Sequence, residues 1–130
     1  MAVKKPSPKI ESFLPRHRDR LTLEPPVRVP LPSKVRVLGR DITIGYAGPA
    51  EGFTDAGEMH EEHLAIKVLE GQIEIEEADT VLHETIHGID YLLALELTER
   101  QVRLLATALI GIFQDNPEYT TYLVRPLSRI

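Results

Sequence analysis

The sequence predicts an α+β fold, in which a small three-stranded antiparallel sheet packs on two helices. Three observations support this prediction. Apolar and polar residues alternate between residues 35 and 46 and again between 63 and 69, with the period of half-buried strands. Two later segments, 74–95 and 98–114, repeat apolar residues with the spacing of amphipathic helices. Proline is concentrated in residues 1–33, where it opposes regular structure.

Residues 1–33 are predicted to form an extended, partly disordered arm that precedes a folded domain of residues 34–130. Proline at this density prevents helices and central strands. The arm is also basic on an otherwise acidic chain, so it can contact a partner or nucleic acid, although a solvated tail is the simpler interpretation. Its prolines are Pro6, Pro8, Pro15, Pro25, Pro26, Pro30 and Pro32, and its basic residues include Lys4, Lys5, Lys9, Arg16, Arg18, Arg20 and Arg28.

The sheet is expected to begin near Lys34 and to contain three strands. The first two are joined by Gly39-Arg40-Asp41, which indicates a β-hairpin with glycine at the turn. Residues 47–62 are rich in glycine and acidic residues and are expected to form a loop. Glu70-Gly71-Gln72 is predicted to be the turn into the first helix. The strands are expected at residues 35–38, 42–46 and 63–69.

Two helices are expected after the strands. The first starts between Glu74 and Asp79 and runs to about Leu95. The second begins after Thr98, because Thr98 can act as the N-cap and Gln101 then occupies the third helical position, as in a capping box. Asp115-Asn116-Pro117 ends this helix. A short apolar segment, residues 119–124, is expected to pack back on the domain.

Composition narrows the classes of function. The formal net charge of −5 argues against a nucleic-acid-binding surface. The absence of cysteine excludes disulfides, cysteine-ligated zinc and a cysteine nucleophile, so His, Asp or Glu must hold any metal. No apolar run approaches the roughly 18 residues of a membrane span, and the first residues form no hydrophobic signal core. A soluble, cytoplasmic protein without membrane or nucleic-acid partners is therefore expected.

The first helix contains the pattern H-E-x-x-H, as His83-Glu84-Thr85-Ile86-His87. Histidines four residues apart on a helix lie one above the other, so both imidazoles can reach one Zn²⁺ at roughly 2.0–2.1 Å. Glu84 borders that metal and can take a proton from a metal-activated water. A chain of this composition contains the pattern by chance about one time in fifty, and the apolar helical stripe around it narrows the chance further.

The segment from Val81 to Leu123 combines three features: the core Leu82-His83-Glu84-Thr85-Ile86-His87-Gly88-Ile89-Asp90, then Leu97-Thr98-Glu99-Arg100-Gln101-Val102, and finally Asp115-Asn116-Pro117. With these features it resembles a group of small, mostly phage-encoded metallopeptidases of the zincin class. It is also distantly similar to the IrrE-like peptidases, which cleave repressors. The resemblance implies a minimal zincin-like fold, a zinc cofactor, a protein or peptide substrate and, for a phage-encoded chain, a bacterial host cytoplasm.

Glu99 is the preferred third zinc ligand. Gluzincin-type enzymes take this ligand from a second helix, and a short antiparallel linker can bring the first turn of that helix beside the metal helix. The spacing from His87 is shorter than gluzincins usually show. Asp90 is a rival, better suited to orient a histidine than to bind the metal. His60 and His63 are a further possibility, although a solvated pair of loop histidines is the simpler interpretation.

The predicted function is zinc-dependent peptide hydrolysis by a metalloendopeptidase, with Glu84 as the general base. Tyr91, Tyr119 and Tyr122 are candidates for stabilising the oxyanion, and the sequence does not rank them. One alternative is a catalytically silent, zinc-stabilised interaction domain of a phage or prophage protein. Another is an ordinary core helix that binds no metal.

Overall fold

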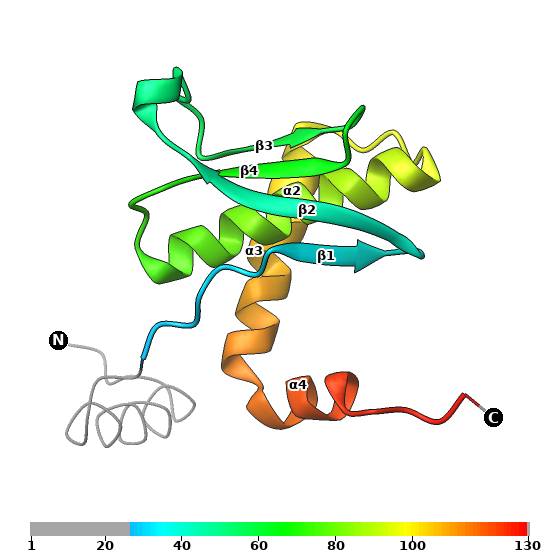
Figure 1. The fold of residues 1–130 in the computed structure, drawn as a ribbon. Coiled ribbons are helices and arrows are strands. Elements are labelled where there is room, and N and C mark those ends of the chain that lie inside the picture. The colour runs from blue at the N-terminus through cyan, green and yellow to red at the C-terminus, as the bar shows by residue number, and fades with distance from the viewer. Residues whose placement is uncertain (1–26, 130) are drawn as a thin grey trace, which may run out of the picture. The chain divides into compact units, whose positions relative to one another are not determined.

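Within the described residues the fold is α+β, as the sequence predicts, with one four-stranded sheet followed by three α-helices (Figure 1). The computed structural model describes residues 27–129, and the chain divides into two units, residues 1–30 and 31–130. The described helices and strands all belong to the second unit. They are β1 (Lys34–Val37), β2 (Arg40–Ala47), the short 3₁₀ helix η1 (Pro49–Glu51), β3 (Gly57–His60), β4 (Ala65–Leu69), α2 (Glu74–Leu93), α3 (Glu99–Asp115) and α4 (Pro117–Val124).

The prediction of three antiparallel strands is wrong in detail, because the sheet is mixed and has a fourth strand. Its order is β1-β2-β4-β3, and β2 pairs with β4 in parallel, from Thr43 opposite Ala65 to Ala47 opposite Leu69. The pairs β1–β2 and β3–β4 are antiparallel. The additional strand, β3, falls within residues 47–62, which are predicted to be a loop. Pairing along β4 gives this segment its extended conformation despite its weak strand propensity.

The predicted hairpin at the start of the sheet is confirmed. β1 and β2 are joined by Leu38 and Gly39, whose φ values of 50° and 80° are those of a type I′ turn. Glycine adopts this conformation without steric cost. The turn fixes the register that directs Val37, Ile42 and Ile44 to the buried face of the sheet.

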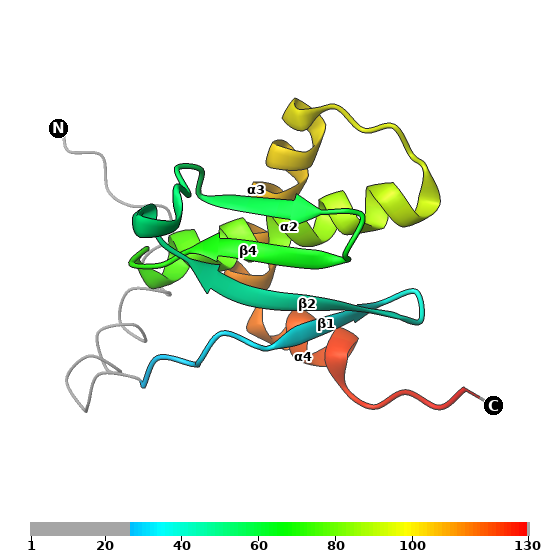
Figure 2. The same cartoon turned by 45° about the horizontal axis from the view of Figure 1, so that its top comes forward.

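α2 lies against one face of the sheet, and α3 packs on another side of α2 (Figures 1 and 2). Toward the sheet, α2 presents Val81, Ile89 and Leu92. On another side, its Leu82 and Ile86 pack against Val102 and Ala106 of α3. Each fully buried aliphatic side chain stabilises the fold by roughly 1.5–3 kcal/mol. Because α2 contributes to both clusters, its position is fixed from two sides. The sheet side of the core consists of Val37, Ile42, Ile44, Ile66 and Val68.

The boundaries of α3 follow the sequence prediction. The Thr98 side chain accepts a hydrogen bond from the Gln101 N–H at 3.1 Å, and the Gln101 side chain accepts one from the Thr98 N–H at 2.8 Å. This confirms the capping box. α3 ends at Asp115, and α4 begins at once with Pro117. α4 contacts α3, as a segment that packs back should, but none of its residues is buried.

The predicted arm, residues 1–33, lies for the most part outside the described residues, which begin at residue 27. Within residues 27–129, no helix has the length and apolarity needed to cross a bilayer.

Candidate metal centre and active site

His83, Glu84 and His87 lie in the middle of α2. The two histidine rings stand one helical turn apart, with their centroids 5.0 Å from each other and their planes at 62°. Both side chains are partly exposed, at 17% for His83 and 28% for His87. The apolar residues on either side of them pack against the sheet and α3, so the imidazoles project from the helix between these two buried surfaces.

Glu99, the first residue of α3, meets both histidines. Its Oε2 lies 2.8 Å from Nε2 of His83, and its Oε1 lies 2.9 Å from Nε2 of His87. The structure therefore brings the preferred third ligand to the two histidines of the motif. The short spacing between His87 and Glu99 is long enough for α3 to return to α2.

The linker between α2 and α3 produces this return. Ala94 and Glu96 adopt left-handed conformations, with φ values of 52° and 62°, and turn the chain sharply after α2. The Asp90 side chain accepts a hydrogen bond from the Leu97 N–H at 3.3 Å, which ties the linker back to α2. Asp90, the rival third ligand, thus holds the linker and is not in the group of possible metal ligands.

The donor set of these three residues fits a zinc ion. Two imidazole nitrogens and a carboxylate oxygen all lie within 4.8 Å of one another. Zinc takes nitrogen and oxygen ligands at about 2.0–2.2 Å, which places neighbouring ligands of a tetrahedral site about 3.4 Å apart. The observed distances of 2.8 and 2.9 Å need only a small outward movement to reach that separation. Three protein ligands leave one position of a tetrahedral site open, as in catalytic zinc sites.

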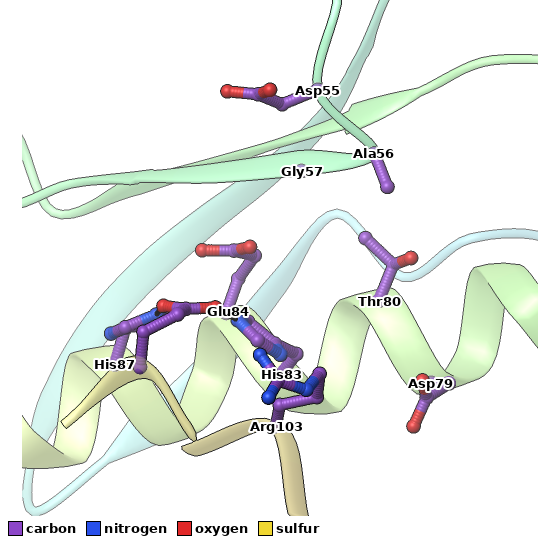
Figure 3. A pocket seen from close by; sticks show the side chains of 10 residues that line it. Asp55, Ala56, Gly57, Asp79, Thr80, His83, Glu84, His87 and Arg103 are labelled. Carbon is purple, nitrogen blue, oxygen red and sulfur yellow. Dashed lines mark hydrogen bonds and ion pairs between the residues drawn. The ribbon is translucent and has the colours of Figure 1, made fainter. Parts of the chain in front are cut away.

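The Glu84 side chain lies between α2 and the edge of the sheet, and only 6% of the residue is exposed. Burial raises the pKa of its carboxyl group to about 7, with further increases from Glu99, Glu58 and Asp55 and an opposing decrease from His87. A carboxyl group with a pKa near neutral pH can both accept and return a proton. The Glu84 side chain points toward β3, away from the helix axis (Figure 3).

Gly57, the first residue of β3, permits this close approach of strand and helix. A Cβ atom at this position would lie 2.6 Å from Cγ2 of Thr80 and 3.0 Å from Cγ of Glu84. Real Cβ atoms essentially never come within 2.6 Å of another heavy atom, and 3.0 Å is also a tight contact, so the strand passes this closely over α2 because residue 57 has no side chain. β3 therefore supplies the cover that keeps Glu84 from solvent.

A cavity of about 500 Å³ lies over the His83, His87 and Glu99 group. Its walls come from three places: the residues leading into β3, one face of α2, and the first half of α3. Beyond the residues already described, it includes the charged side chains Asp55, Asp79 and Arg103 (Figure 3). Residues 47–62, which the sequence predicts to be a loop, contribute the wall beside β3 through Asp55, Ala56 and Gly57.

The other candidates from the sequence lie elsewhere. His60 and His63 border a separate cavity of about 290 Å³, and Nε2 of His60 lies 3.1 Å from Oε1 of Glu58. Tyr91, Tyr119 and Tyr122 are exposed and are not part of the cavity lining. None of these five side chains belongs to the group around Glu99.

Six residues of the cavity lining are not among the candidates that the sequence predicts, namely Asp55, Ala56, Gly57, Asp79, Thr80 and Arg103. Arg103 could have been found, since it lies four residues after Glu99 on a predicted helix and so shares its face. Asp79 lies four residues before His83 on the other predicted helix and likewise shares its face. Gly57 could not, because its role depends on a strand that the sequence does not reveal.

Comparison of this chain with protein-family models, curated proteins and solved structures gives no match.

Proposed function

We propose that this protein is a zinc-dependent metallopeptidase of the zincin type that hydrolyses peptide bonds in a protein or peptide substrate. One observation carries the proposal: two histidines and a glutamate that suit zinc converge beside a buried glutamate, within one cavity. His83, His87 and Glu99 would hold the metal. Zinc, when bound, supplies a Lewis acid that polarises the scissile carbonyl and makes water a stronger nucleophile at neutral pH.

Glu84 is the general base of this proposal. Its carboxylate takes one proton from the attacking water as the new carbon–oxygen bond forms, and delivers it to the nitrogen of the leaving amine as the carbon–nitrogen bond breaks. Its low exposure keeps bulk water from competing for that proton.

β3 offers a place for an extended substrate. It is the edge strand of the sheet, so the side that faces away from β4 carries backbone groups that no other strand of the described sheet pairs. An extended peptide can add to such an edge by main-chain hydrogen bonds. Since Gly57 of β3 lies directly over Glu84, a peptide on this edge would pass close to the proposed base.

The test is hydrolysis of a mixed peptide library by the zinc-loaded full chain, read by mass spectrometry. The wild type is expected to cleave a subset of the peptides. Glu84→Gln is nearly isosteric and should abolish cleavage, by at least a hundredfold, while leaving the zinc content at the wild-type level. Glu62→Gln, which changes an exposed glutamate outside the cavity, is the matched control. Unchanged cleavage by Glu84→Gln would contradict the assignment of the base.

A zinc-stabilised interaction domain without catalytic activity is the second candidate. It is favoured by exposed apolar side chains on α3 and α4, among them Leu104, Tyr119, Tyr122 and Val124, whose exposed fractions are 51, 52, 60 and 73%. Exposed apolar groups of this size are typical of surfaces that bind other proteins. Stoichiometric zinc together with no cleavage of any peptide by the wild type would favour this candidate.

A further inference from the structure

Arg103 lies at one end of the cavity, on the same helix as the proposed ligand Glu99. The two residues are one turn apart on α3 and therefore share a face. Side chains on a helix lean toward its N-terminus, so the Arg103 side chain leans toward the first turn, where Glu99 lies. Figure 3 shows it extending to the side of the cavity on which His83 lies, and both residues line that cavity.

The guanidinium of Arg103 has no carboxylate partner among residues 27–129. Glu99, the nearest acidic residue on its own helix face, already directs one oxygen to each histidine. Among the described side chains that line the cavity, Arg103 alone carries a permanent positive charge. The guanidinium carries five N–H donors, and none of them is paired with a carboxylate within the described residues.

The carboxylate of Asp79 is a suitable group to orient the guanidinium of Arg103. It lies one turn before His83 on α2 and lines the same cavity. Its Oδ1 atom is buried and has no hydrogen-bond partner within the described residues. An arginine can give two donors to one carboxylate and still offer others to a second, so contact with Asp79 would leave Arg103 able to bind a ligand.

We propose that Arg103 binds a carboxylate of the substrate beside the scissile bond, and so makes this protein selective for acidic peptides. The proposal rests on the proposed peptidase function and names its substrate class. Guanidinium and carboxylate form two parallel hydrogen bonds, which gives both affinity and orientation. The carboxylate can come from an Asp or Glu side chain or from the C-terminus of the peptide.

The experiment measures peptide binding to the zinc-loaded full chain carrying Glu84→Gln, by NMR shift titration with three peptides whose N-termini are acetylated. Acetyl-(Ala)₅-amide has no carboxylate, acetyl-(Ala)₅ with a free C-terminus has a terminal one, and acetyl-Ala₂-Glu-Ala₂-amide has a side-chain one. At least one acidic peptide is expected to bind about tenfold more tightly than the neutral peptide, and which one does so identifies the source of the carboxylate.

Adding Arg103→Gln should remove this tenfold preference without changing the zinc content or the affinity for the neutral peptide. Arg103→Lys should retain part of it, because lysine keeps the charge but loses the fork. Arg100→Gln, which removes an exposed arginine of α3 that is not part of the cavity lining, is the matched control. Equal affinities for all three peptides, no detectable binding of the acidic ones, or a preference that survives Arg103→Gln would overturn the proposal.

Failure of the peptidase proposal would look different. Cleavage of the same peptides is measured in parallel with the wild-type residue at position 84. If the wild type cleaves nothing while the preference for acidic peptides depends on Arg103, the cavity binds carboxylates without hydrolysing peptides. If cleavage occurs without any such preference, the peptidase stands and the role of Arg103 falls.

Discussion

Glu84 shows how one residue's surroundings set its chemistry. Glu84 is 94% hidden from solvent, and within residues 27–129 no lysine or arginine forms an ion pair with it, so ionising its carboxyl group is costly. The structure accepts that cost directly beside two histidines and a third acidic residue. Such a carboxyl group is typical of functional sites, where stability is given up for reactivity.

This cost gives the stability of the metal-free protein a specific pH dependence. The pKa of Glu84 is raised from 4.5 to about 7 in the folded state, so between these values the folded protein holds a proton that the unfolded chain has released. The free energy of unfolding should therefore fall as the pH rises through this interval, by up to about 3 kcal/mol. Below pH 4.5 Glu84 no longer makes the free energy of unfolding depend on pH, because its carboxyl group is then protonated in both the folded and the unfolded state.

Urea denaturation of metal-free protein between pH 4 and pH 8 measures this dependence. Glu84→Gln cannot ionise, so it should lose the decrease and exceed the wild type in stability at pH 8 but not at pH 4.5. Glu62→Gln serves as the control for removal of an exposed carboxylate. Parallel pH profiles for the wild type and Glu84→Gln would show that Glu84 is not buried in this way.

At the scale of elements, the site depends on how closely β3 passes over α2. A strand of four residues at the edge of a sheet is held mainly by its pairing with β4 and by what lies beneath it. Gly57 sets that distance, because its neighbours across the gap are Thr80 and Glu84. Glu84 and the strand β3 that covers it are thus one structural unit.

Gly57→Ala should disrupt this unit. The added Cβ would come within 2.6 Å of Thr80, which forces strand and helix apart and should destabilise the fold by about 1–3 kcal/mol. Peptide hydrolysis should fall by more than tenfold while zinc binding persists, since the change does not touch the three ligands. Thermal denaturation, zinc content and cleavage rate measure the three effects.

Gly45→Ala is the matched control for this prediction. Gly45 is also a strand residue, in β2, but the nearest atom to an added Cβ is Nζ of Lys67 at 3.8 Å, an ordinary contact. If Gly57→Ala proves as stable and as active as Gly45→Ala, the strand does not pack on Glu84 as described.

For the whole molecule, local patterns predict the helices well and the sheet only in part. The helical stripes, the capping box at Thr98 and the Asn116-Pro117 break act within a few residues, so the sequence shows them directly. The parallel pairing of β2 with β4 joins segments that are about twenty residues apart, and no local pattern encodes it. β3 escapes prediction for the same reason.

The sequence likewise predicts one part of the candidate site and not the other. The spacing of His83, Glu84 and His87 on one helix predicts their arrangement from sequence alone. The position of Glu99 depends on a linker in which Ala94 and Glu96 adopt left-handed conformations. These residue types rarely do so, and the sequence therefore gives no sign of how sharply the chain turns. The order of the two helices predicts Glu99 as the third ligand, and the conformation of the linker brings its carboxylate into contact with both histidines.

The central claim is that His83, His87 and Glu99 together bind one zinc ion, and elemental analysis of the purified full chain tests it most directly. The wild type and His63→Ala, a control histidine outside the group, should each hold one zinc per chain. His87→Ala and Glu99→Ala should each lose it, with circular dichroism showing that both remain folded. A wild type that takes up no zinc when it is supplied, or a Glu99→Ala variant that keeps its zinc, would contradict the account.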